Sequence, residues 1–205
     1  GESDGRLNAT ENWIPTGIGV MKFVNPADCN YDSGIINHRT VLTIRYADIL
    51  LMYAEALNEL TGSHQIPSWD GSTTYSVSRE IDELRKGIKP VCMRAGIPDY
   101  DGATYADQDQ FRKKIKNERQ VEFFAENHRY YDIRRWKDAP KEEGEPIYGC
   151  NTLMDKEHAE DFYVPVQIPD LLTAFSRKMY FWPVLKDELQ RNKNLTQAPG
   201  WQDFE

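Results

Sequence analysis

The chain has 205 residues, with 25 basic and 33 acidic side chains, so its formal net charge is −8. Apolar residues make up 40% of it and aromatic residues 12%, which excludes disorder of the whole chain because disordered proteins lack such side chains. Proteins that bind duplex nucleic acid are usually basic, so no nucleic-acid partner is expected. The three cysteines, Cys29, Cys92 and Cys150, show no zinc-ligand spacing, although two of them could form a disulfide.

Residues 1–40 are rich in Gly, Pro, Asn and Asp and are interpreted as a loop-rich lead-in, with a strand predicted at 18–24. Its polar start lacks a secretory signal, and we expect a longer chain to precede it. From residue 42 to 60, apolar residues recur at helical spacing and predict a first helix. This helix is apolar on more than one side, so we expect it to be packed between neighbours.

Residues 63–77 exceed the usual length of a helix–helix connection and are predicted to form a loop. A second helix is predicted to begin near Ser76 or Ser78, either of which could cap it, and to end at Ala95. Pro90 lies inside this helix, where a proline is expected to cause a kink.

A third and longest helix is predicted from Asp107, a capping residue, to about Asp138, with a break near Asn127. Three such helices predict a mainly α fold over 41–139, built from helical hairpins of the tetratricopeptide kind. The rest of the chain, 140–205, is predicted to be a loop-rich tail with minor β structure. Strands are expected there at 162–168 and 179–182, and one or two helical turns at 186–190.

One stripe of the predicted third helix mixes apolar residues with charges of both signs. Because buried charges must be paired, we interpret this stripe as a network of ion pairs that holds the helices together. The residues assigned to the network are Arg45, Glu55, Glu118, Arg119, Glu122, Glu126, Arg129 and Asp132.

The sequence disfavours two other functions for this stripe. A di-iron bundle needs Glu-x-x-His on two helices, but His128 is only two residues from Glu126 and so faces elsewhere. A phosphate-binding stripe is disfavoured because the interleaved carboxylates neutralise it. The sequence also lacks a G-x-S-x-G elbow and a Gly-rich phosphate loop, so no catalytic residue, metal or cofactor is expected.

Several aromatic residues fall outside the predicted helices, among them Trp13, Trp69 and Tyr75. The apolar face of a sugar ring stacks on an aromatic face, while Tyr and Trp keep a polar tip for hydrogen bonding. These three residues are therefore candidate sugar platforms. The alternative is that each fills a gap between helices and loops.

Four stretches of the sequence occur in an order that carries a family resemblance. They are Ile44–Glu59, Arg94–Pro98, Glu118–Trp136, and Phe181–Pro183 with the following Asn192–Trp201. Together they resemble the C-terminal region of the SusD/RagB family of outer-membrane nutrient-binding lipoproteins. Asn127 departs from the family pattern, which usually has Gly there.

This resemblance implies a scaffold of tetratricopeptide-like hairpins with long loops folded onto it. It also implies a protein that is anchored on the outer membrane by a lipidated Cys and hands oligosaccharides or peptides to a TonB-dependent transporter. Such proteins bind their ligands without covalent chemistry. Because family members are much longer, an N-terminal half with the lipid anchor and part of the ligand site is expected to precede residues 1–205.

Two rival functions are also consistent with the sequence. The helical hairpins could serve as an interaction scaffold for a protein partner, which requires an exposed helix face with apolar patches. The chain could also be a glycoside hydrolase, which requires two carboxylates about 5–10 Å apart beside a cleft.

Overall fold

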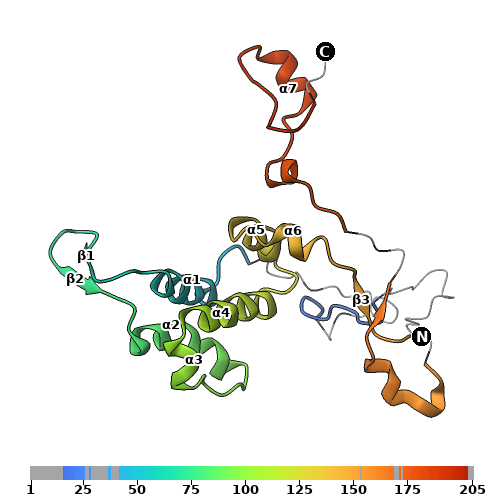
Figure 1. The fold of residues 1–205 in the computed structure, drawn as a ribbon, viewed down its shortest axis with the longest axis horizontal. Helices are drawn as coiled ribbons and strands as arrows, with labels where there is room; N and C mark the ends of the chain where they lie inside the picture. The colour runs from blue at the N-terminus through green and yellow to red at the C-terminus, as the bar shows by residue number, and fades with distance from the viewer. Residues whose placement is uncertain are drawn as a thin grey trace. The chain divides into compact units, whose positions relative to one another are not determined.

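The computed structural model describes residues 16–25, 28, 37, 42–152, 154–168, 171 and 173–202. The chain divides into two compact units: residues 33–129, called the helical unit below, and residues 1–32 together with 130–205. Most regular structure is helical and the strands are short (Figure 1), so the predicted mainly α fold is confirmed.

Three helices form the core of the helical unit: α1 (Tyr46–Asn58), α2 (Ile81–Arg94) and α4 (Gln108–Glu122). Helix α1 begins at Tyr46 and not at residue 42, where its start was predicted, because Arg45 is in an extended conformation. Apolar residues three or four positions apart turn one side of each helix inward. The fully buried side chains that meet in this core include Leu51, Leu84, Ile88, Phe111 and Ile115.

Helices α1 and α2 approach each other closely at Gly87. A Cβ atom at this position would lie 2.7 Å from both the Ala54 Cβ and the Leu50 carbonyl oxygen. Glycine normally weakens a helix interior, but here its missing side chain allows the two helix backbones to come together. The small pair Gly87 and Ala54 therefore fixes how closely the helices pack.

The segment between α1 and α2 is a β-hairpin, so the predicted loop at 63–77 is wrong. Strand β1 (His64–Pro67) pairs antiparallel with β2 (Thr74–Val77), and Ile66 lies opposite Tyr75. Asp70 and Gly71 lie in the connecting turn, where Gly71 has φ of +70°. In Figure 1 the hairpin extends beyond the ends of the helices that it connects.

The predicted third helix is interrupted where a break was expected. Asp107 caps α4 by accepting hydrogen bonds from the backbone of Asp109 and Gln110, and α5 (His128–Arg135) follows a five-residue turn. Asn127 has φ of +66°, a left-handed conformation that Asn tolerates better than most residues. A short helix that was not predicted, α3 (Gly102–Ala106), precedes α4.

The second unit contains short elements. They are α6 (Ala139–Glu142), β3 (Tyr148–Gly149) paired with β4 (Val166–Gln167), the 3-10 helices η1 (Lys156–Tyr163) and η2 (Arg177–Tyr180), and α7 (Lys186–Arg191). Helix α7 confirms the helical turns predicted at 186–190. The strand predicted at 179–182 is wrong, the one at 162–168 is reduced to β4, and none of the described residues 16–25 forms a strand.

Two of the three cysteines belong to the described residues. Cys92 is buried and Cys150 is partly exposed, and both are free thiols, while Cys29 lies outside the described residues. Within the described ranges, no helix has both the length and the apolar character needed to cross a bilayer.

Candidate functional site

Arg45 ties the start of α1 to the end of α4. Its Nε and Nη2 atoms donate hydrogen bonds to the two carboxylate oxygens of Glu126, each at 2.8 Å, and Nη1 donates to Glu122 Oε1 at 2.6 Å. Arg94 of α2 donates to the other oxygen of Glu122. Burial by itself would raise the pKa of Glu122, but the hydrogen bonds from Arg94 and Arg45 hold that pKa below its ordinary value. These contacts connect all three core helices.

A second buried ion pair lies beside the first. Arg119 Nη1 donates to Asp48 Oδ1 at 3.1 Å, and both side chains are almost fully buried. The guanidinium carbons of Arg45 and Arg119 lie 5.0 and 5.1 Å from the centre of the Phe123 ring, and the His128 ring stacks on it at 4.4 Å. The ring therefore supports both cations through cation–π attraction.

The carboxylate of Glu118 lies beside two weak hydrogen-bond donors. The Cys92 thiol and the Tyr100 hydroxyl form hydrogen bonds with it. Burial, together with the charge of Glu122, raises the pKa of Glu118 despite these bonds. The same burial raises the pKa of Cys92 to about 11, so this thiol stays protonated and unreactive at neutral pH.

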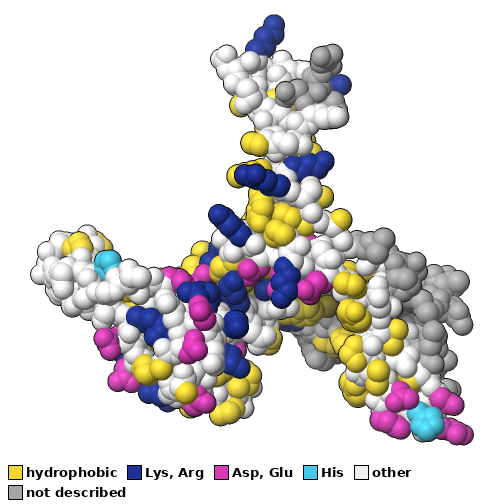
Figure 2. All heavy atoms as spheres, in the orientation of Figure 1, with side chains coloured by type: hydrophobic (Ala, Val, Ile, Leu, Met, Phe, Trp, Pro, Cys, Tyr) yellow, Lys and Arg dark blue, Asp and Glu magenta, His cyan; other side chains and the backbone are white. Residues whose placement is uncertain are grey.

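The structure pairs several residues of the predicted network with one another or with neighbours. Arg45, Glu122 and Glu126 form one cluster and Arg119 pairs with Asp48, while Asp132 accepts a hydrogen bond from Arg135 at 2.9 Å. Glu55 and Arg129 are half-buried. Among the described residues there is no group of three His, Cys, Asp or Glu side chains that could hold a metal. In Figure 2 acidic and basic side chains are interspersed over the helical unit, as pairing requires.

A groove between α1, the hairpin and the start of α2 is the candidate binding site, and it is called the hairpin groove below. It is a cavity of about 710 Å³ whose walls include Tyr53, Leu57, Ile66, Tyr75, Glu83 and Lys86. This volume falls in the range of small-molecule sites, about 300–1,000 Å³. Cross-strand pairing places Ile66 and Tyr75 next to each other, so the hairpin supplies one apolar wall and α1 the other.

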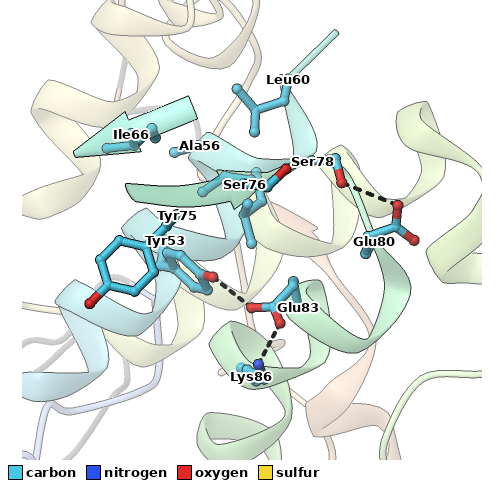
Figure 3. A pocket seen from close by; sticks show the side chains of 12 residues that line it. Tyr53, Ala56, Leu60, Ile66, Tyr75, Ser76, Ser78, Glu80, Glu83 and Lys86 are labelled. Carbon is cyan, nitrogen blue, oxygen red and sulfur yellow. Dashed lines mark hydrogen bonds and ion pairs between the residues drawn. The ribbon is translucent and has the colours of Figure 1, made fainter. Parts of the chain in front are cut away.

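Tyr53 of α1 and two charged residues of α2 form a polar cluster in the hairpin groove. The Tyr53 hydroxyl donates to Glu83 Oε2 at 2.8 Å, and the Lys86 ammonium donates to Glu83 Oε1 (Figure 3). Hydrogen bonds from Lys86 and Tyr53 hold the pKa of Glu83 below its ordinary value. Burial raises the pKa of Tyr53, and the bond to Glu83 raises it further, so the phenol keeps its proton. In Figure 3 the Tyr75 hydroxyl points away from this cluster.

The turn of the hairpin presents an aromatic side chain to solvent. Trp69 is 98% exposed. Beside it, Asp70 Oδ1 accepts hydrogen bonds from the hydroxyls of Ser68 and Ser72 and from the Ser72 backbone, which lowers the pKa of Asp70 to about 2. These hydrogen bonds stabilise the turn that presents Trp69 to solvent.

The three aromatic residues proposed from loop placement thus have different surroundings. Tyr75 lines the hairpin groove, Trp69 lies at the hairpin tip outside its lining, and Trp13 lies outside the described residues. Tyr53 was not proposed because it belongs to a predicted helix. The sequence feature that could have indicated Tyr53 is the second apolar side of α1. That side was expected to pack against a neighbour, but its residues Tyr46, Ile49 and Tyr53 are exposed.

Comparisons with known proteins agree with one another. Residues 2–201 match the model of the SusD family. The chain is 28% identical over 160 residues to SusD-like protein P2 of Formosa agariphila, covering 75% of this chain and 28% of that protein. It is 31% identical over 115 residues to SusD-like protein P38 of the same organism, covering 56% of this chain and 20% of that protein.

Solved structures give the same result. The selenomethionine structure of BT4246 superposes with a TM-score of 0.69 at 27% identity, covering 93% of this chain and 30% of that one. The SusD-like protein BF3747 from Bacteroides fragilis superposes with a TM-score of 0.57 at 26% identity, covering 80% and 26%. The chain spans less than a third of the length of each of these relatives. Since the family match extends over almost every residue, the chain belongs to the SusD family.

Proposed function

We propose that this chain is the C-terminal region of a cell-surface protein that captures an oligosaccharide and delivers it to a TonB-dependent transporter. Proteins of the SusD family are outer-membrane lipoproteins that bind glycans for uptake. The chain covers only 28% and 30% of two of its relatives, which supports a longer protein whose lipid anchor lies outside residues 1–205. The single observation that carries the proposal is the hairpin groove with its two tyrosines.

The hairpin groove combines aromatic surface with hydroxyl groups, and both can contact a sugar. Tyr53 and Tyr75 provide aromatic surface for the C–H face of a sugar ring, and Ile66 extends that surface. Ser76 and Ser78 line the same cavity, and their hydroxyls both donate and accept hydrogen bonds, as sugar hydroxyls do. Binding by a few stacked rings is expected to be modest, because ordering the ligand offsets part of the gain.

The proposal includes binding without covalent chemistry, which is typical of the family. A glycoside hydrolase needs one carboxylic acid that stays protonated near neutral pH to donate to the leaving group. In the hairpin groove Glu83 has the opposite property, because Lys86 and Tyr53 stabilise its ionised form. This argues for recognition of the sugar and against its hydrolysis at this site.

Titration calorimetry against a panel of oligosaccharides tests this function, using the complete product of the gene. We expect saturable heat with at least one glycan and no release of reducing sugar from any of them. A panel without binding would contradict glycan capture and favour a peptide ligand. Release of reducing sugar would show a hydrolase instead.

An interaction scaffold is a second candidate, favoured by the exposed side of α1. Tyr46 is 75% exposed and Ile49 and Met52 are also exposed, which leaves an apolar stripe along the helix. Exposed apolar patches of this kind often mark protein contacts. Binding to a purified protein partner without binding to any glycan would support this candidate.

A further inference from the structure

We propose that the hairpin groove selects neutral glycans and rejects glycans that carry carboxylate or sulfate groups. The inference rests on the proposed function and names the ligand class for the same site. It follows from the charges that the groove presents and from how they are already paired.

Three ionisable charged side chains are among the described residues that line the groove: Glu80, Glu83 and Lys86. They give two negative charges and one positive charge. The Lys86 ammonium is engaged with Glu83, so it does not stand free as a partner for an anionic ligand. Glu80 accepts a hydrogen bond from the Ser78 hydroxyl at 3.2 Å, a neutral donor that leaves its charge uncompensated by that contact.

Arg79, which precedes Glu80 in the sequence, forms its hydrogen bonds with residues outside the groove lining. Arg79 Nε donates to Asn58 Oδ1 at 3.0 Å, and Nη2 donates to the Tyr105 carbonyl oxygen at 2.7 Å. Carboxylate and sulfate ligands are usually held by the paired N–H groups of an arginine. No arginine is among the described residues that line the groove.

Lys86 offsets part of the charge of Glu83, so the repulsion of an anion comes from the net negative charge that Glu80, Glu83 and Lys86 give together. Hydrogen bonds from Lys86 and Tyr53 hold the pKa of Glu83 below its ordinary value, so Glu83 stays an acceptor. A sugar hydroxyl can instead donate to Glu80 or Glu83. The same two carboxylates therefore attract a neutral sugar and repel an acidic one.

Chemically matched glycan pairs test the selectivity directly. The probes are oligogalacturonate with its carboxyl-reduced form and a sulfated galactan with its desulfated form, each titrated into the complete product of the gene. We expect each neutral form to bind at least about tenfold more tightly than its acidic parent. An acidic parent that binds as tightly as its neutral form, or more tightly, would overturn the inference and leave glycan capture intact.

Variants then connect the selectivity to this groove. Glu80→Gln combined with Glu83→Gln is expected to reduce the difference within each pair at least threefold, because both repelling charges are removed. Lys86→Met is expected to increase the difference. Asp82→Asn is the matched control, since Asp82 is a carboxylate in the same helical turn, is 90% exposed, and does not line the groove.

The outcomes separate the inference from the function on which it rests. A difference that is the same in the glutamine variant, the methionine variant and wild type would contradict the assignment of selectivity to this groove. Melting temperatures identify a variant that fails to fold. If the glutamine variant does not fold, the increase in the affinity difference expected for Lys86→Met tests the assignment to this groove. Absence of binding by all four probes and by the wider oligosaccharide panel would contradict glycan capture itself, and the selectivity with it.

Discussion

Arg45→Ala is expected to lower the free energy of unfolding by about 3–5 kcal/mol, the usual cost of removing one partner from a buried ion pair. The side chain of Arg45 is 16% exposed, and it contacts the side chains of Glu122 and Glu126, which are 9% and 6% exposed. Alanine would leave the Glu126 carboxylate without its two hydrogen bonds from Arg45. Urea unfolding followed by circular dichroism measures the change.

Arg112→Ala is the matched control. Arg112 on α4 also joins the α1 region, through Glu59 at the end of that helix, but these two side chains are 32% and 46% exposed. Exposed pairs contribute about 0–1 kcal/mol, so this variant should be close to wild type. Equal losses for Arg45→Ala and Arg112→Ala would mean that the buried cluster has no special structural role.

Phe123→Ala is expected to cost about 3–5 kcal/mol of stability, as is typical for the truncation of a buried phenylalanine. Phe123 is 2% exposed and supports both Arg45 and Arg119. Its loss would open a cavity and withdraw the ring from both cations. Chemical denaturation again gives the difference in free energy between the variant and wild type.

The neighbouring phenylalanine provides the comparison. Phe124 has the same side chain and adjoins Phe123 in the same turn, but it is 56% exposed. A substitution at an exposed position usually changes stability by less than about 0.5 kcal/mol, and we expect Phe124→Ala to lie near that value. If both alanine variants were equally unstable, the ring of Phe123 would not be the support that its contacts indicate.

Helices were predictable where one face is buried in the core. Helices α1, α2 and α4 repeat apolar residues at three and four positions, and the core of the helical unit forms from those faces. The break near Asn127 was also predictable, because Asn tolerates the left-handed conformation found there. The boundaries were less accurate, since the cap residues Arg45 and Glu80 form no side-chain capping bond.

The hairpin was missed for a physical reason. Each strand has only four residues, and although Thr74–Val77 alternates polar and apolar residues, so short a run is a weak strand signal and β1 does not repeat it. The candidate site was therefore predictable only in part. Tyr75 could be proposed from its position outside the helices, whereas Tyr53 meets it only after the hairpin folds beside α1.

Binding by a Tyr75→Ala variant tests the central claim, that the hairpin groove holds the glycan, most directly. Tyr148→Ala is the control, because Tyr75 and Tyr148 are both 56% exposed but only Tyr75 lines the groove. With the oligosaccharide that gives the strongest heat in the panel, Tyr75→Ala should weaken binding at least about tenfold, or about 1.4 kcal/mol. Tyr148→Ala should keep the wild-type Kd. A wild-type Kd for Tyr75→Ala would contradict the claim.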